Sequence, residues 1–252
     1  MTGAACGLGA CFARKLAQRG YNLVLIDRRG EELERSCAEL TAAHGIVAEP
    51  FVADLTDHAA LEAVGRRLEQ VTDLDLLVNN AGFGMFKPFV ETDVERHLDM
   101  IRVHVVTGVW LTRAMLPGMI ARDRGAVVNV SSLGAWVPSA GNVMYASTKS
   151  YLAVFSEAIQ EELRGSSVRV QALCPGFVRT EFHDCDGMAG FDRRQIPGPL
   201  WMSPEDVVDC SLRSLSGKRV IVVPGLWNRV LAGLVRRSLL QPLVRFIARP
   251  KR

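Results

Sequence analysis

The chain opens on Thr2-Gly3-Ala4-Ala5-Cys6-Gly7-Leu8-Gly9, and a segment of helical period follows over residues 8–19. Glycines let the backbone approach a ligand closely, and the first turn of a helix presents amide N–H groups that have no partner within the helix. This turn is therefore a candidate site for the pyrophosphate of a dinucleotide. The alternative is a turn whose glycines serve only close packing. Its expected contact residues are Gly3, Gly7, Leu8 and Gly9.

Short apolar runs alternate with longer helical segments beyond this turn. We expect strands at 23–26, 47–52, 74–78, 126–130, 168–173 and 220–223, each rich in Val, Leu or Ile. We expect helices at 8–19, 31–44, 59–70, 93–122 and 144–164. This alternation gives a parallel sheet with right-handed crossovers. The sequence shows no internal repeat and no linker, so it predicts a single α/β domain over 1–225 with a doubly wound sheet.

The start of the chain departs from this pattern. A doubly wound sheet needs a strand before its glycine-rich turn, and only Met1 and Thr2 precede Gly3. Without a central strand, the backbone groups of both neighbouring strands would lack partners, which costs more than the roughly 5–15 kcal/mol that stabilises a domain. We therefore expect a first strand truncated at its N-terminus, and we hypothesise that the natural start lies upstream of Met1.

Composition excludes several classes of protein. The 252 residues are 48% apolar and 23% charged, and the mean hydropathy is +0.13. A disordered or low-complexity chain would be less apolar, and no apolar run reaches the roughly 18 residues of a membrane-spanning helix. The six cysteines form no CxxC pair, which in a chain of this length indicates reduced thiols and a cytoplasmic protein. We expect no metal site.

Charge is unevenly distributed along the chain. The net charge is +3, yet no Asp or Glu follows Asp209, and residues 210–252 hold ten Lys or Arg. The segment 226–252 is basic and amphipathic, contains Trp227, and reads as a helix to Ala248 that Pro242 interrupts. Such a segment suits an anionic membrane surface. The alternatives are a helix that covers the core or an oligomer seam. No nucleic-acid recognition motif is found.

Asp27 follows the strand at 23–26, eighteen residues after Gly9. A carboxylate at this place accepts the hydroxyls of an adenine ribose, which favours NAD. Arg28 and Arg29 come next, and guanidinium groups suit the 2′-phosphate of NADP, although two arginines at a helix entry are also explained by solvation alone. Cys6 stands where a second basic residue would support NADP. On balance the sequence slightly favours NAD.

Polar residues also follow the next two strands. Asp54 and Leu55 close one strand, and Asn80, Ala81 and Gly82 follow the other. Ligands of open α/β sheets bind at the carboxyl ends of the strands, so these residues are candidate cofactor contacts, with Asp54 placed to accept from an adenine amino group. The alternative for the asparagines is a turn or a helix cap.

Ser132, Tyr145 and Lys149 form the most informative group. Tyr145 and Lys149 are four residues apart on the helix expected at 144–164, so they share one face. A nearby ammonium stabilises phenolate and lowers the pKa of a tyrosine, which can then act as a general acid or base at an alcohol or carbonyl. Ser132 ends the strand at 126–130, close to where the substrate oxygen would lie.

In this order, the motifs resemble those of the short-chain dehydrogenase/reductase family, from Thr2 to about Gly225. The resemblance rests on the glycine-rich turn, Asn79-Asn-Ala-Gly, Ser132, Tyr145-x-x-x-Lys149 and Pro175-Gly176-x-x-x-Thr180. It implies a Rossmann fold, an NAD(P) cofactor, reversible alcohol–carbonyl oxidoreduction and a homo-oligomer. It also implies that Tyr145 is the acid/base, that Lys149 binds the nicotinamide ribose and that Ser132 holds the substrate oxygen. The expected contacts of the nicotinamide end are Pro175, Gly176, Val178 and Thr180.

One position departs from the family pattern. The family places a catalytic Asn before Leu111-Thr112-Arg113-Ala114, and His104 occupies that position here. The resemblance gives that Asn the role of holding a water in a proton relay to the lysine. A histidine can also hold a water, and it titrates near pH 6.5, so we expect His104 to serve the relay. The alternative is a packed helix residue and an impaired relay.

Residues 181–203 correspond to the family's substrate loop and are rich in aromatic side chains. With Phe83, Met85, Phe86 and Trp136 they would line an apolar pocket for a bulky or lipid-like alcohol or ketone, unless they pack only on one another. The leading hypothesis is an oxidoreductase with a small-molecule substrate. The rival hypotheses are a non-catalytic dinucleotide sensor and a membrane-docked binding protein on the same fold.

Overall fold

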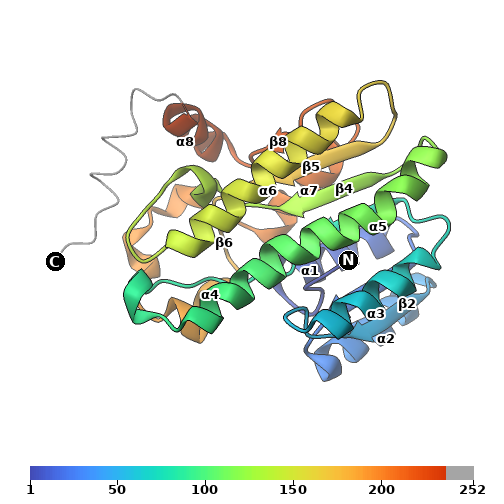
Figure 1. Ribbon diagram of the computed structural model, residues 1–252, viewed down its shortest axis with the longest axis horizontal. Helices are drawn as coiled ribbons and strands as arrows, with labels where there is room; N and C mark the ends of the chain where they lie inside the picture. The colour runs from blue at the N-terminus through green and yellow to red at the C-terminus, as the bar shows by residue number, and fades with distance from the viewer. Residues whose placement is uncertain (237–252) are drawn as a thin grey trace.

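The computed structural model describes residues 1–236 and shows a parallel sheet between two layers of helices (Figure 1). Four strands pair in the order β3-β4-β5-β8, and β1 pairs with β2. All of these pairs are parallel. The strands are β1 (Leu23–Asp27), β2 (Ala48–Val52), β3 (Leu76–Asn79), β4 (Ala126–Val130), β5 (Arg169–Leu173) and β8 (Ile221–Val222). The α/β fold is therefore confirmed, with strand bounds within about two residues of those expected.

Met1 and Thr2 lie between β1 and β3 and join the two groups of strands. The Ile26 N–H donates to the Met1 carbonyl at 2.9 Å, and the Thr2 N–H donates to the Val78 carbonyl at 3.0 Å. Thr2 also forms a parallel bridge with Ile26. This short segment thus occupies the central position of the expected truncated first strand.

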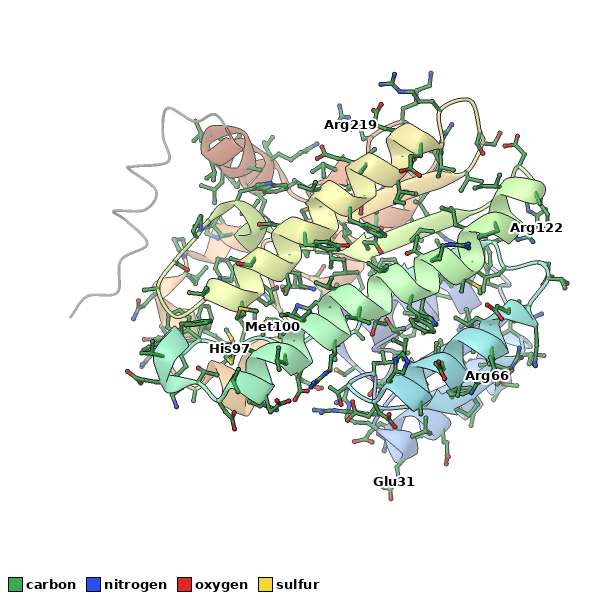
Figure 2. All side chains as sticks on the ribbon, in the orientation of Figure 1. Glu31, Arg66, His97, Met100, Arg122 and Arg219 are labelled. Atoms are coloured by element: carbon green, nitrogen blue, oxygen red, sulfur yellow. The ribbon has the colours of Figure 1, made fainter. Side chains whose placement is uncertain are left out.

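The strands of the sheet centre are buried on both faces. Val127 and Val128 are neighbours on β4, and each belongs to a different hydrophobic cluster. One cluster packs under α1 (Gly7–Ala17), α2 (Gly30–His44) and α7 (Pro204–Ser214). The other packs under α3 (His58–Glu69), α5 (Thr107–Ala121) and α6 (Val143–Glu162). Charged side chains such as Glu31 and Arg66 project outward (Figure 2). Continuous apolar strands therefore form a doubly covered sheet.

A helical rod spans residues 94–121, where the sequence predicts one helix. It consists of α4 (Val94–Ile101), a π-helical turn at Arg102–Val106, labelled η2, and α5. By length and composition alone the rod could cross a membrane, but it packs on α3, α6, β3 and β4. A π turn closes hydrogen bonds between residues five apart rather than four. The apolar period continues through it, so the sequence carries no signal for it.

The segment after β5 is partly ordered into short elements. β6 (Phe177–Val178) pairs with β7 (Trp201–Met202), and four 3-10 turns lie between them. They are η4 (Glu181–Asp184), η5 (Asp186–Met188), η6 (Arg193–Gln195) and η7 (Gly198–Leu200). Two further 3-10 turns are η1 (Phe89–Glu91) and η3 (Leu133–Trp136). The β6–β7 ribbon gives the expected substrate loop a folded base.

The last described element is α8 (Leu226–Arg236), which lies at one end of the molecule. It contacts η3 and η7, so it sits beside the loop of residues 181–203 (Figure 1). The expectation of a helix at the start of the tail is confirmed. The rest of that prediction, the helix to Ala248 and its break at Pro242, falls outside the described residues.

Candidate active site

The glycine-rich turn is tied to the end of β3. The Thr2 hydroxyl accepts hydrogen bonds from the Asn80 and Ala81 N–H groups, at 3.1 and 3.0 Å. The Asn80 amide donates in turn to the Gly3 carbonyl at 2.9 Å. A Cβ at Gly3 would lie 2.8 Å from the Cα of Ala81, and one at Gly9 would collide with the Gly3 carbonyl. These glycines are therefore required by close packing, and they leave the first turn of α1 open to a ligand.

The Asp27 carboxylate is held by the glycine-rich turn. Its Oδ2 accepts from the Ala5 N–H at 2.9 Å, and its Oδ1 accepts from the Arg29 N–H at 3.1 Å. The Arg29 guanidinium lies 3.6 Å from Asp27 and 3.8 Å from Glu181. The negative charge of Asp27 is thus compensated by the Ala5 and Arg29 N–H groups and by the Arg29 guanidinium. Arg28, the next residue, is exposed to solvent. Sequence reasoning missed the structural role of Asp27.

Asp54 and Leu55 lie just after the end of β2. The Asp54 carboxylate accepts from both the N–H and the hydroxyl of Thr56, at 2.9 and 2.8 Å. These hydrogen bonds lower the pKa of Asp54, the backbone one most strongly. Asp54 is exposed and Leu55 is buried. The carboxylate therefore shapes its own turn, and its second oxygen is free of the contacts described.

Ser132, Tyr145 and Lys149 come together at the carboxyl end of β4. The Ser132 hydroxyl hydrogen-bonds the Tyr145 phenol and also accepts from the Gly134 N–H at 3.0 Å. The Lys149 ammonium lies 5.7 Å from the centre of the Tyr145 ring. Burial raises the pKa of Tyr145, and the bond from Ser132 opposes that rise. The structure thus assembles the three side chains that the sequence motif predicts.

Lys149 is a buried cation. Its side chain is 4% exposed, and its Nζ donates to the Val130 carbonyl at 2.8 Å. Burial lowers its pKa from 10.5 to about 8. The Ser131 hydroxyl donates to the Lys149 carbonyl and fixes the same turn of α6 to β4. A Cβ at Gly82 would lie 2.8 Å from His104 Nε2, so a glycine here lets the imidazole pack against this turn.

His104 lies in the π turn and is 2% exposed. Its Nε2 accepts from the Phe83 N–H at 3.1 Å, so its Nδ1 carries the proton and donates to Thr148 Oγ1 at 2.9 Å. The Thr148 hydroxyl then donates to the Tyr145 carbonyl at 3.1 Å. Burial, and secondly Lys149, hold the pKa of His104 well below its usual range. A neutral imidazole with both nitrogens engaged fits a positioning role better than a proton relay.

Thr148 is a residue that sequence reasoning missed, although it stands inside the Tyr-x-x-x-Lys motif. A buried Thr beside the motif lysine, facing a His one helix away, is the signal that was present. Asn228 is a second case. It is 2% exposed, donates to Met202 Sδ at 3.4 Å, and occupies the place that a Cβ at Gly176 would need. The sequence feature that points to Asn228 is a single amide side chain within the apolar segment that forms α8.

The expected nicotinamide contacts lie together next to the glycine-rich turn. The Pro175 carbonyl accepts from the Leu133 N–H at 2.8 Å, which joins this segment to the turn after Ser132. Val178 is buried on the short β6 strand. A Cβ at Gly7 would lie 3.5 Å from the Thr180 side chain. Residues 175–180 therefore extend from the catalytic group to the first turn of α1.

The aromatic side chains of the substrate loop divide into two groups. Phe177, His183 and Phe191 stack on one another and, with Phe86 and Trp201, form a packed cluster. Phe182 instead lies 5.8 Å from the Tyr145 ring, and Phe83 lies 5.7 Å from His104. Most of the loop's aromatic side chains thus stabilise the loop itself. Only a few rings face the catalytic group.

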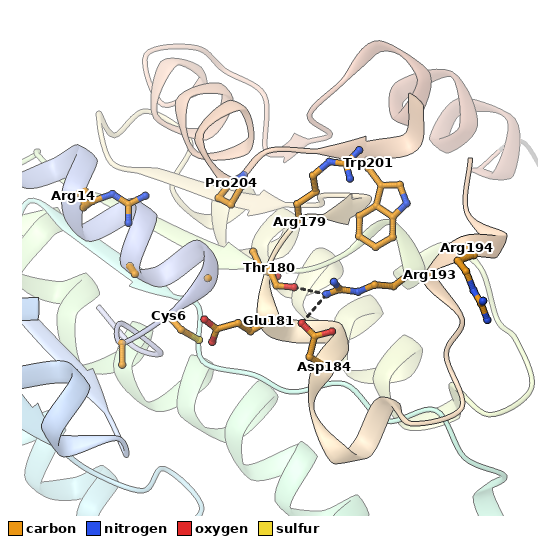
Figure 3. A pocket seen from close by; sticks show the side chains of 13 residues that line it. Cys6, Arg14, Arg179, Thr180, Glu181, Asp184, Arg193, Arg194, Trp201 and Pro204 are labelled. Atoms are coloured by element: carbon orange, nitrogen blue, oxygen red, sulfur yellow. Dashed lines mark hydrogen bonds and ion pairs between the residues drawn. The ribbon is translucent and has the colours of Figure 1, made fainter. Parts of the chain in front are cut away.

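An open cleft of about 750 Å³ runs between α1 and this loop (Figure 3). Cys6 and Arg14 line it from α1, and Arg179, Thr180 and Arg193 line it from the other side. Arg193 donates to the Thr180 carbonyl at 2.6 Å and pairs with Asp184 at 3.1 Å. The cleft does not contain Tyr145. Its helix N-terminus and its arginines suit phosphate groups, so we assign it to the dinucleotide side of the site.

Comparisons with known proteins agree with this arrangement. The model of the short chain dehydrogenase family matches residues 1–186. The NADP-dependent 3-hydroxy acid dehydrogenase YdfG of Salmonella typhi is 34% identical over 218 residues, which are 83% of this chain and 85% of that protein. A short-chain dehydrogenase from Sphingobium yanoikuyae, solved with NADPH, is 31% identical, with a TM-score of 0.83 over 95% of this chain and 93% of that one.

A third similar protein is the bulky-bulky ketone specific alcohol dehydrogenase from Comamonas testosteroni. It is 26% identical, with a TM-score of 0.80 over 95% of this chain and 92% of that one. The family model covers well over half of this chain, and the relatives match along most of their own length. The chain therefore belongs to the short-chain dehydrogenase/reductase family and is an NAD(P)-dependent oxidoreductase.

Proposed function

We propose that this enzyme interconverts a secondary alcohol and a ketone, with Tyr145 as the general acid/base. The observation that carries the proposal is the assembly of Ser132, Tyr145 and Lys149 at the carboxyl end of β4. A sensor of dinucleotides would need the cofactor site alone. It would have no use for a tyrosine whose phenol is hydrogen-bonded to a serine and lies beside a buried ammonium.

In the proposed reaction, the nicotinamide of the bound cofactor supplies or accepts the hydride. The Ser132 hydroxyl holds the substrate oxygen, and Tyr145 donates a proton to that oxygen in reduction or removes it in oxidation. The Lys149 ammonium lies 5.7 Å from the centre of the Tyr145 ring, and a positive charge at that place favours the phenolate. Because the pKa of Lys149 is about 8, this support is present at neutral pH and is lost above pH 8.

The residues present fit a nicotinamide dinucleotide, because the backbone at Cys6 and Gly7 lines the open cleft of about 750 Å³ beside the N-terminus of α1. The sequence slightly favours NAD, and the comparisons do not support that preference. We propose that NADP is accepted, with Arg28 and Arg29 at its 2′-phosphate. The support is the local compensation of the Asp27 charge by the Ala5 and Arg29 N–H groups, together with the NADP dependence of a relative.

For His104, we propose positioning rather than proton transfer. The ring connects the Phe83 backbone to Thr148, and Thr148 connects to the Tyr145 carbonyl. This chain of hydrogen bonds fixes the turn of α6 that carries the acid/base. The relay expected for His104 stays a prediction, and its depressed pKa argues against uptake of a proton near pH 7.

For the substrate, we propose a bulky apolar alcohol or ketone. Phe182 faces the Tyr145 ring, and Phe83, Met85 and Met188 lie around the same entrance with little exposure to solvent. A relative that acts on bulky-bulky ketones shares the fold over most of both chains. The six cysteines are all free, as expected for a cytoplasmic enzyme.

For the assembly, we propose a homo-oligomer formed through the outer faces of α5 and α6. Large apolar side chains are exposed there, with Trp110 at 36% and Tyr151 at 42%. Val106 at the end of η2 and Val154 on α6 are exposed as well. Burying apolar side chains between two copies removes them from water, which is the main driving force for stable association.

The reaction is tested with Tyr145→Phe, which removes the phenolic proton and keeps the ring. We expect turnover of ketones to fall about 10³-fold while the affinity for NADPH changes less than about threefold. Tyr21→Phe, an exposed tyrosine ahead of β1, is the matched control and should be silent. Retention of turnover by Tyr145→Phe would overturn the proposed acid/base, and failure of the wild type to bind either dinucleotide would overturn the enzyme assignment.

A further inference from the structure

The outward face of α8 carries a stripe of exposed apolar side chains. Leu226 is 65% exposed, Trp227 62%, Val230 48% and Leu234 44%. At 100° per residue these four positions share an arc of about 100°, which is the width of a typical buried helix face. The opposite face packs on the protein through Asn228, which is 2% exposed. In the described chain, α8 therefore buries one face on the protein and exposes a stripe of apolar side chains on the other.

The sequence from Leu226 onward is basic. Residues 226–252 hold seven Lys or Arg and no Asp or Glu, whereas the first 209 residues are net acidic. Arg229 lies at the border of the stripe and is exposed. Basic residues beside a hydrophobic helix face are the combination that binds anionic lipid surfaces, because lipid phosphates attract the cations while the acyl region accepts the apolar side chains.

A second copy of the chain is a poorer occupant for this face. A twofold interface through α8 would bring the same surface of both copies together. Arg229 borders the stripe, so the exposed Arg229 side chains of the two copies would approach one another, and like charges at an interface cost several kcal/mol. A nucleic acid would neutralise the positive charge, but it would leave Leu226, Trp227 and Val230 without apolar partners.

We propose that α8 docks the enzyme on an anionic bilayer surface. The position of α8 makes the docking relevant to the active site. The helix contacts η7 in the loop of residues 181–203 and η3 directly after Ser132, and Asn228 packs against Gly176. A bilayer bound at α8 therefore lies next to the loop that faces Tyr145. An apolar substrate would pass between lipid and site over a short path.

The test uses the full chain and vesicles of phosphatidylcholine, with or without about 30% phosphatidylserine. We expect flotation with the anionic vesicles, and at least about a tenfold smaller bound fraction with phosphatidylcholine alone or in about 0.5 M salt. Leu226→Ser/Val230→Ser should lower binding to anionic vesicles by at least about tenfold. Tyr21→Ser/Val47→Ser removes apolar side chains of comparable exposure at the far end of β1 and β2 and should bind like the wild type.

Three results would overturn the docking: no flotation of the wild type, equal binding to both kinds of vesicle, or equal binding by both double variants. Sedimentation without lipid tests whether a second copy of the chain occupies the face. If Leu226→Ser/Val230→Ser dissociates an oligomer and Tyr21→Ser/Val47→Ser does not, the face is a protein interface. NADPH affinity and ketone turnover are measured without lipid. The double variants should keep both, so a failure of docking is distinct from a failure of the proposed reaction.

Discussion

The surroundings of Ser132, Tyr145, Lys149 and His104 form one corner of the molecule, here called the catalytic corner. Asp27, Arg28 and Arg29 form another, called the ribose corner after the adenine ribose proposed to bind there. Both lie at the carboxyl edge of the sheet, yet they are built differently. At the catalytic corner Lys149 and His104 are almost fully buried, and each polar atom has a defined partner. At the ribose corner Arg28 is exposed, and Arg29 is shared between Asp27 and Glu181 at 3.6 and 3.8 Å. Burial thus imposes one geometry on the first corner, whereas solvent permits several at the second.

Lys149→Met tests the catalytic corner at its buried cation, whose burial costs the most free energy. Lowering the pKa of Lys149 from 10.5 to about 8 corresponds to roughly 3 kcal/mol at neutral pH. Met removes that cost and leaves the Val130 carbonyl without its donor, at about 1–3 kcal/mol. We therefore expect about a 10³-fold loss of turnover together with stability at pH 7 equal to or above that of the wild type, measured by denaturant unfolding.

The pH dependence of stability gives the same prediction a second readout. Between pH 8 and 10.5 the unfolded chain binds the Lys149 proton and the folded protein does not, so the free energy of unfolding of the wild type rises across this window. Lys149→Met should lose that rise, and Lys218→Met, an exposed lysine, should keep it. A destabilised Lys149→Met with an unchanged pH slope would contradict the account of this corner.

The same contrast explains what could be predicted from the sequence. The motif spacing predicts that Tyr145 and Lys149 share one face of α6, and the structure brings both beside Ser132 at the end of β4. The roles of these residues in the reaction stay predictions. The cofactor preference was not predictable, since the partners of Asp27 are backbone N–H groups that a residue pattern does not reveal. The π turn was missed for a similar reason, because it leaves the apolar period intact.

His104 distinguishes a proton relay from a structural link. His104→Ala removes the acceptor of the Phe83 N–H and the donor to Thr148, so we expect about a 30-fold loss of kcat with little change in the shape of the pH profile between pH 6 and 9. His104→Asn keeps a short polar side chain and should recover part of the rate. If the acidic limb of the pH profile of kcat were shifted in both His104 variants relative to the wild type, the relay would instead be established.

Arg28→Ala tests the open corner. We expect about a tenfold weaker Kd for NADPH and no change for NADH, measured by cofactor fluorescence, because a partly exposed charged contact contributes about 1–1.5 kcal/mol. Arg35→Ala, an exposed arginine on α2, is the control and should change neither constant. If Arg28→Ala weakened both dinucleotides equally, the 2′-phosphate would not be its partner, and NAD would again be the favoured cofactor.

The smallest effect is expected at Thr148, and it decides whether the buried corner acts through hydrogen bonds or through packing. Thr148→Val has nearly the same shape but leaves the His104 Nδ1–H and the Tyr145 carbonyl without the hydroxyl that joins them. We expect about a threefold loss of kcat with KM unchanged, because Tyr145 stays in place and loses only part of its constraint. Thr148→Ser restores the hydroxyl at the expense of a methyl group and should recover the rate. Equal rates for Thr148→Val and the wild type, with a slower Thr148→Ser, would show that the methyl group matters more than the hydrogen bond. The hydrogen bonds from His104 to Thr148 and from Thr148 to the Tyr145 carbonyl would then accompany the close packing without contributing to the rate.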